Sequence, residues 1–260
     1  MVKKYLFILL IAVTFSSVPL YAEDIQTGWI SGQMMIKDGG PMSNGMVVFF
    51  RADKGPPPNP DRYMRVPDEI AGIEEDGKFR VSLPVGKYFM GAIKRMSGES
   101  IGPPHDGDYF FIRRDIQEVP VTYLIEEGKN LSVGIIAEAV PFKLEIPEDV
   151  TGISGSILDL KNKPVAGAIV FAYVTETMTG LPPFASYRTG EDGKYFISVS
   201  NGGRYYLRVR DKYGGGPPVA GEVMGGYGEE KAAAVNVKEG KITAKIDIKV
   251  IRHFQRGPKQ

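Results

Sequence analysis

Short apolar segments alternate with polar turns along most of the chain. Residues 79–83 and 195–199, for example, alternate apolar and polar side chains, and Gly, Pro or Asp-Gly stand between such segments. A period of two is typical of strands that bury one face, and the punctuating residues favour tight turns. No segment after the N-terminus has convincing helical spacing, so the pattern predicts an all-β protein.

One unit of this pattern occurs twice. The string EDGKFR at residues 75–80 returns as EDGKYF at residues 191–196. In such a turn Asp caps its own backbone, Gly takes positive φ, and a strand follows. Gly32 to Pro41 and Gly155 to Pro164 have the same spacing, so the copies keep register through the first strand and turn. We therefore expect two tandem antiparallel β-sandwich domains of about seven strands each.

The repeat also places the boundaries. We assign residues 1–22 to a signal peptide, 23–140 to the first sandwich, 141–149 to a linker, 150–252 to the second sandwich and 253–260 to a tail. The linker contains two prolines and is expected to be semi-rigid. In the last strand, positions 242, 244, 246, 248 and 250 are apolar, so all five are expected to face inward.

The N-terminus has the composition of an export signal. Lys3 and Lys4 precede an apolar run at residues 5–13, and a Ser/Pro break leads to Ala22, after which we expect cleavage. This run is too short for a stable membrane span, and no later stretch approaches about 18 apolar residues. The sequence predicts an exported protein, periplasmic or extracellular, with no membrane span after signal cleavage.

Composition argues against several classes of function. The predicted signal peptide contains two lysines and no acid, so 30 basic residues face 31 acidic ones in the remainder. The charges are mixed along the chain, unlike the basic stripe of a nucleic-acid binder, so no nucleic acid is expected as a partner. Without cysteine, disulfides, thiol catalysis and Cys-ligated metals are excluded.

Catalytic and metal-binding side chains are sparse. The chain has two histidines, and His105 begins a His-Asp-Gly-Asp string that fits an Asp-Gly turn as well as a divalent-cation site. No Gly-x-Ser-x-Gly turn is present. Met34, Met35 and Met46 are expected to pack in the core of the first copy, in preference to binding copper. We expect no enzyme activity, no catalytic residue, no metal and no cofactor.

The second copy resembles a known family. Residues 155–159 (GSILD), 163–170 (KPVAGAIV), 189–195 (TGEDGKY) and 203–205 (GRY) look like the carboxypeptidase regulatory-like domain, also described as transthyretin-like. More distant similarity extends to the B-type repeats of collagen adhesins and to carbohydrate-binding-like folds. The match covers most of residues 150–251, whereas the first copy departs from it through Met-rich first strands and two long insertions. The resemblance implies an antiparallel sandwich and a non-catalytic accessory role, although function does not transfer from fold alone.

Paired Pro-rich loops are the candidate binding site. They follow the second strand of each copy, at 54–60 and 179–184, and the fourth, at 101–105 and 214–219. If the strands run alternately up and down, both loops of a copy emerge at one end as a stiffened rim. Nearby aromatic rings can stack on sugars or dock a protein with little ordering entropy to lose. The candidate binding residues are Tyr63, His105, Tyr109, Phe110, Phe184, Tyr187, Tyr213 and Tyr227.

Two functions remain open at this point. The first is an exported interaction module that mediates protein assembly or adhesion at the cell envelope, with an unknown envelope or extracellular protein as partner. The second is a carbohydrate-binding protein, with a glycan as partner; a hydrolase with an unrecognised site comes third. Exposed aromatics beside Asp and Asn would favour sugar, and a large apolar patch would favour a protein. Aromatics that only fill small cores under the loops would favour neither.

Overall fold

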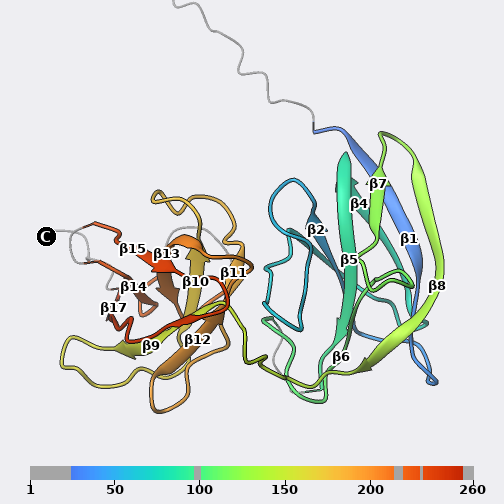
Figure 1. Ribbon diagram of the computed structural model, residues 1–260. Coiled ribbons are helices and arrows are strands. Elements are labelled where there is room, and N and C mark those ends of the chain that lie inside the picture. Colours follow the sequence, from blue (N-terminus) through green and yellow to red (C-terminus); the bar gives the residue numbers. More distant parts are fainter. Residues whose placement is uncertain (1–24, 97–100, 214–218, 229–230, 254–260) are drawn as a thin grey trace, which may run out of the picture.

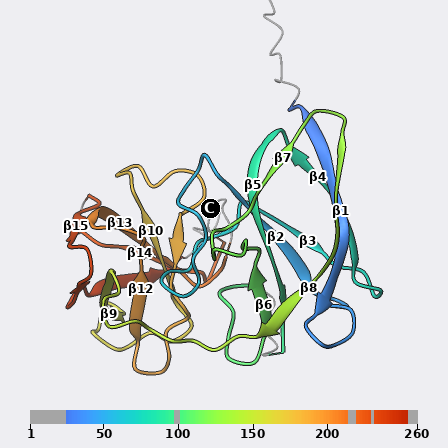
Figure 2. The ribbon, with the colours of Figure 1, turned by 45° about the vertical axis from the view of Figure 1, so that its right-hand side comes forward.

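The computed structural model describes residues 25–96, 101–213, 219–228 and 231–253. The predicted signal peptide, residues 254–260 of the predicted tail and residues 214–218 of one Pro-rich loop lie outside the described residues. Every regular element in the described ranges is a β-strand. The strands form two domains that lie side by side (Figures 1 and 2). The predicted all-β fold of two tandem sandwiches is confirmed.

The first domain has eight strands whose hydrogen-bonded order is β3-β2-β5-β6-β8-β1-β4, with β7 also beside β5. β8 pairs with β1 along most of its length and with β6 at its end, so the sheet folds over into two layers around a core. The strands are β1 (Thr27–Ile36), β2 (Met46–Arg51), β3 (Glu69–Gly72), β4 (Lys78–Pro84), β5 (Gly86–Lys94), β6 (Tyr109–Ile112), β7 (Thr122–Ile125) and β8 (Asn130–Pro141).

The second domain repeats this arrangement. Its order is β11-β10-β13-β14-β17-β9-β12, with β15 beside β13 and β16 beside β9; the order matches the first domain, except that β16 and β17 together take the place of β8. The strands are β9 (Gly152–Leu158), β10 (Ile169–Tyr173), β11 (Phe184–Ala185), β12 (Lys194–Ser198), β13 (Gly203–Arg210), β14 (Val223–Gly226), β15 (Ala234–Val237), β16 (Ile242–Thr243) and β17 (Ile248–Arg252). Some pairings depart from the antiparallel expectation: β8 runs parallel to β1 in the first domain, and β16 and β17 run parallel to β9 in the second.

The repeated acidic turn has the predicted local structure. Asp76 and Asp192 each accept a hydrogen bond from the backbone N–H two residues later, at 3.0 and 3.1 Å. Gly77 and Gly193 have φ of 86° and 65°, a region that side chains with a Cβ rarely enter. The turn therefore starts β4 and β12 in the same way in both copies.

The last strand of the second domain corrects the sequence prediction. Lys245 has a φ of 63°, and the chain is not in a strand between β16 and β17. Of the five positions expected to face inward, Ile248 and Val250 are buried, whereas Ile242 is 49% exposed. An extra residue at such an irregularity moves the following side chains to the opposite face, which the alternation in sequence does not reveal. Gly134, with a φ of 68°, accompanies a register shift between β1 and β8 in the first domain.

Strands β2, β5 and β10 are buried on both faces, and this property positions the site described below. In β2, Val47 and Phe49 point into the first core, whereas Val48 and Phe50 belong to a separate apolar cluster on the outer face. All five residues of β10 are buried in the same two-sided manner. Each sandwich therefore has a second apolar surface outside its core, and something must cover it.

Candidate functional site

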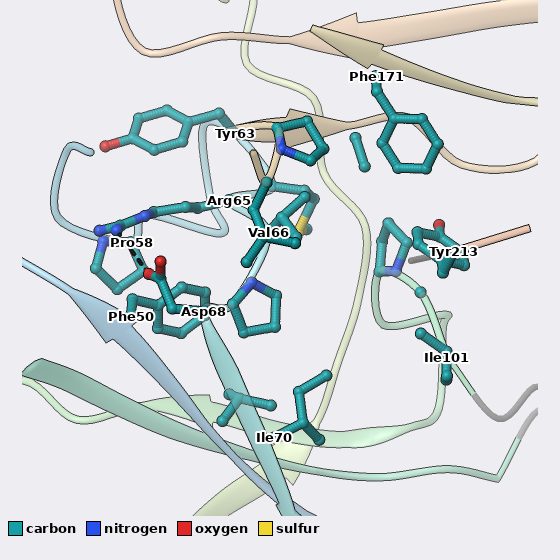
Figure 3. A pocket seen from close by; sticks show the side chains of 18 of the residues that line it. Phe50, Pro58, Tyr63, Arg65, Val66, Asp68, Ile70, Ile101, Phe171 and Tyr213 are labelled. Atoms are coloured by element: carbon teal, nitrogen blue, oxygen red, sulfur yellow. Dashed lines mark hydrogen bonds and ion pairs between the residues drawn. The ribbon is translucent and has the colours of Figure 1, made fainter. Parts of the chain in front are cut away.

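A cavity of about 800 Å³ lies between the two domains. Its first side is the outer face of β2, β3, β5 and β6, and its second side is the outer face of β10, β11 and β13. Residues 58–60, 63–68, 101–104 and 177–182 complete the walls. In Figure 3, Val66, Ile70 and Ile101 of the first domain and Phe171 and Tyr213 of the second surround the open space. We call this space the interdomain cavity.

The first side of the interdomain cavity is almost entirely apolar. Met46, Val48 and Phe50 alternate along β2 with the residues of the first core, so they share the outer face. Ile93 of β5 and Ile112 of β6 extend the same face across the sheet. This surface arises because the sequence gives these strands apolar residues at consecutive positions, as expected of strands covered on both sides.

The second side combines aromatic rings with arginines. Phe171 and Tyr173 stand on the outer face of β10, and the Tyr213 ring packs edge-to-face on Phe171 at 5.8 Å between centroids. Arg208 and Arg210 alternate on β13 with residues of the second core. Burial raises the pKa of Tyr173, and the positive charge of Arg208 partly opposes that rise.

The loop after β2 is fixed by Arg65, whose side chain is 2% exposed. Its guanidinium donates hydrogen bonds to the carbonyl oxygens of Pro56, at 2.6 Å, and Arg51, and it forms an ion pair with Asp68 at 3.2 Å. Burial lowers the pKa of Arg65, and the charge of Asp68 opposes this effect. A buried cation that loses such partners destabilises strongly, so these contacts hold the Pro-rich loop in one conformation.

The same loop joins the second domain. Tyr63 packs edge-to-face on Phe184 at 5.6 Å and belongs to the core of the second domain, although its sequence position is in the first. Arg65 forms an antiparallel bridge with Phe184, and the Val66 N–H donates to the Pro183 carbonyl at 2.9 Å. The first domain therefore extends the edge of the second sheet at β11, a form of strand addition.

Two further contacts link the domains. The Tyr187 hydroxyl donates to the Pro104 carbonyl at 2.8 Å, and its ring packs edge-to-face on His105 at 5.4 Å. Burial is the main cause of a raised Tyr187 pKa. Arg62 pairs with Asp149 of the predicted linker at 2.9 Å, on the surface. Together with the Tyr63 contact, these links frame the interdomain cavity.

The charges around the cavity are mostly neutralised in pairs. Arg65 pairs with Asp68, as above, and Arg95 pairs with Asp108 at 3.1 Å. Arg210 pairs with Glu222, which is 2% exposed and whose pKa is lowered mainly by the Arg210 hydrogen bond. Arg208 differs, because no carboxylate among the described residues forms an ion pair with it.

Two polar atoms of cavity-lining residues are buried without a hydrogen-bond partner in the described part of the chain. They are the Asn59 side-chain oxygen and the Arg95 Nε. Orphaned polar atoms of this kind are rare in native proteins, since each costs roughly 1–3 kcal/mol. Both atoms are inaccessible to solvent, so neither is a contact that a molecule in the cavity can reach.

Only some of the predicted binding residues line the interdomain cavity. Tyr63, Phe110 and Tyr213 line the interdomain cavity. Phe184 is 1% exposed beneath Tyr63, and His105 and Tyr187 contact each other next to the cavity. Tyr109 packs against the first core and Tyr227 against the second. Their role in binding stays a prediction, but Tyr63 and Phe184 lie in the interior and not on the exposed rim that we expected.

The arrangement of the loops also differs from the expected open rims. Loops of both domains face each other across the interdomain cavity, because the apolar outer faces of β2 and β10 lie on its two sides. The sequence analysis missed the lining residues on these strands and the arginines. The signal that could have found them is the unbroken apolar run in each strand, residues 46–50 and 169–173, where a one-faced strand would alternate.

Metal-binding clusters and membrane-spanning helices were the remaining features of interest in the described ranges, and neither is present there. No group of three or more His, Asp or Glu side chains in those residues is placed to hold a metal ion. No helix in the described ranges is long and apolar enough to span a membrane.

No protein-family model matches the chain, and no curated protein matches it. Solved structures that it is similar to include the Bacillus anthracis TIE protein, with 16% identity over 87% of this chain and 34% of that chain and a TM-score of 0.27. BcpA, the major pilin subunit of Bacillus cereus, matches with 10% identity over 88% of this chain and 100% of its own, with a TM-score of 0.27. A DUF3823 family protein from Parabacteroides merdae matches with 12% identity over 83% of this chain and 99% of its own, with a TM-score of 0.26.

The chain spans well under two thirds of the length of some matched proteins. It covers 34% of the TIE protein and 26% of a leucine-rich repeat protein from Bacteroides thetaiotaomicron. These TM-scores are too low to support a statement about function. What the fold defines is a two-domain, all-β sandwich protein, and the resemblance to the carboxypeptidase regulatory-like family stays a prediction.

Proposed function

We propose that this chain is an exported, non-catalytic interaction module that mediates protein assembly or adhesion at the cell envelope through its Pro- and aromatic-rich loops. The observation that carries the proposal is the apolar mouth of the interdomain cavity. We use the term mouth for the three cavity-lining side chains that are also exposed: Ile70, Ile101 and Leu181, which are 45%, 48% and 49% exposed. Large apolar side chains that share one concave surface are typical of sites that bury against a partner.

The mouth depends on the whole fold. Ile70 belongs to β3, Ile101 to the loop after β5 and Leu181 to the loop after β10, so both domains supply it. The contacts made by Tyr63 and Tyr187 hold these elements together before any partner arrives. A preformed surface loses little conformational entropy on binding, which favours affinity.

No specific observation favours a glycan over a protein partner. A sugar needs several free donors and acceptors beside an aromatic face. The Tyr63 hydroxyl donates to the Pro57 carbonyl at 2.6 Å, and the Thr177 and Thr179 hydroxyls lie 3.3 Å apart in a mutual hydrogen bond. The apolar lining therefore supports the protein partner more than the carbohydrate alternative.

The test is affinity capture of the mature protein from its own envelope and culture fractions. Ile101→Asp and Leu181→Asp each place a charge at the mouth, and Ile242→Asp is the matched control, because Ile242 is 49% exposed on β16 and does not line the cavity. We expect a protein partner that wild type and control retain and that both mouth variants lose. Retention by the mouth variants, or signal on a glycan array without a protein partner, contradicts the proposal.

A further inference from the structure

The interior of the interdomain cavity carries a positive charge, on Arg208, that has no part in the proposed partner contact at the mouth. Arg208 lies on the outer face of β13, in register with Phe171 of β10. Its guanidinium carbon lies 5.7 Å from the centre of the Tyr173 ring. Arg65, Arg95 and Arg210 each have a carboxylate partner, so among the described lining residues Arg208 is the one cation without an acidic counterpart.

An uncompensated cation beside an apolar space attracts an anion. Charges in partly buried sites interact more strongly than in water, because less solvent screens them. The guanidinium is a planar fork of donors that fits the oxygens of a carboxylate or phosphate.

The remainder of the lining indicates what kind of molecule can fill the cavity. Apart from the arginines, Asp68, Asn59 and the two threonines, the wall is made mainly of Pro, Met, Val, Ile, Leu and aromatic residues. A peptide backbone or a sugar enclosed here would lack partners for most of its polar groups. A hydrocarbon chain has no such requirement, and a volume of about 800 Å³ lies within the range of roughly 300–1,000 Å³ that is usual for small-molecule sites.

We propose that the interdomain cavity binds an anionic amphiphile, with its apolar body between the two sheet faces and its carboxylate or phosphate head at Arg208. Binding of this ligand goes beyond the interaction module, since it requires no protein partner. It also uses the interior of the cavity, whereas the proposed partner contacts the mouth.

Calorimetric titration of the mature protein with a matched series of twelve-carbon chains tests the proposal. The probes are dodecanoate, dodecyl phosphate, dodecanol and dodecyltrimethylammonium, each below its micelle concentration. We expect one site per chain, with both anions binding at least about tenfold more tightly than the neutral and cationic chains, a difference of about 1.4 kcal/mol. The ratio between dodecanoate and dodecyl phosphate shows which head group the site prefers.

Variants at two arginines of the same strand locate the head group. Arg208→Gln is expected to weaken dodecanoate binding about tenfold and to leave dodecanol binding unchanged. Arg204→Gln is the control, because Arg204 is exposed on β13 and lies outside the cavity lining; it is expected to bind both chains like wild type. Thermal unfolding of each variant confirms that it is folded.

Several results would overturn the proposal. They are equal binding of anionic and neutral chains, dodecanoate binding that survives Arg208→Gln, no binding of any chain, or binding of an acidic apolar peptide in place of the chains. These results leave the proposed function intact, since partner capture is measured with the mouth variants and does not depend on Arg208.

Discussion

At the scale of single residues, Tyr63 links the two domains. Its ring completes the second core against Phe184, and its hydroxyl donates to Pro57 of its own loop. The sequence shows Tyr63 as an aromatic residue beside a Pro-rich loop, and this makes it a candidate binding residue. It does not reveal that the ring is only 9% exposed, because the partner Phe184 belongs to the other copy and the pairing has no local signature.

Replacement of Tyr63 tests this link. We expect Tyr63→Ala to lower the free energy of unfolding by about 3 kcal/mol, the usual cost of deleting a buried aromatic ring. Tyr63→Phe keeps the ring and loses the hydrogen bond to Pro57, at a cost of about 1 kcal/mol. Urea unfolding measures both values. A loss below about 0.5 kcal/mol for Tyr63→Ala would show that the ring is exposed in solution.

The buried Arg210–Glu222 pair predicts a dependence of stability on pH. The Arg210 hydrogen bond lowers the pKa of Glu222 from its usual 4.5. A lowered pKa in the folded state adds stability that is present above about pH 4.5 and is lost as the pH falls through the folded-state pKa.

We therefore expect Glu222→Gln to be less stable than wild type at pH 7, with a difference that shrinks near pH 3. Urea midpoints at both values measure this, and Glu239→Gln, at an exposed site, is the control. An equal difference between wild type and Glu222→Gln at both pH values would contradict the assignment.

At the scale of elements, β2 and β10 determine where the site forms. The repeat predicts a second strand in each copy, directly before the first Pro-rich loop. Their two-sided burial was not predicted, because the strands were interpreted as parts of sheets with one wet face. The unbroken apolar sequence of each strand was visible, but which neighbour covers the second face depends on tertiary structure. Similarly, the left-handed residue Lys245 interrupts an alternation that looks regular in sequence.

Substitutions at adjacent positions of β2 test whether the strand is buried on both faces or on one face only. Phe49 packs in the first core and Phe50 packs on the outer face, with exposures of 0% and 4%. We expect Phe49→Ala and Phe50→Ala each to cost about 3 kcal/mol in urea unfolding. If the outer face were open to solvent, Phe50→Ala would change stability by no more than about 0.5 kcal/mol.

At the scale of the whole molecule, the two domains and the cavity between them form the functional unit. The internal repeat allowed both sandwiches to be predicted, since each half carries its own copy of the pattern. The contacts between the halves occur once and lie outside that pattern: the Tyr63 ring in the second core, the bridge at Arg65 and the Tyr187 hydrogen bond. For this reason the sequence indicated which loops to examine but not that they would face each other.

Both proposals need a preformed cavity, and therefore a fixed arrangement of the two domains. The chain has no cysteine, so two spin labels can be placed without background. Ile135 on β8 and Ile251 on β17 are 71% and 52% exposed and lie on strands of different domains. Double electron–electron resonance on the Ile135→Cys, Ile251→Cys variant is expected to give one narrow distance distribution, which broadens when Tyr63→Ala is added. A broad distribution without Tyr63→Ala would show that the domains move independently and that the cavity is not preformed.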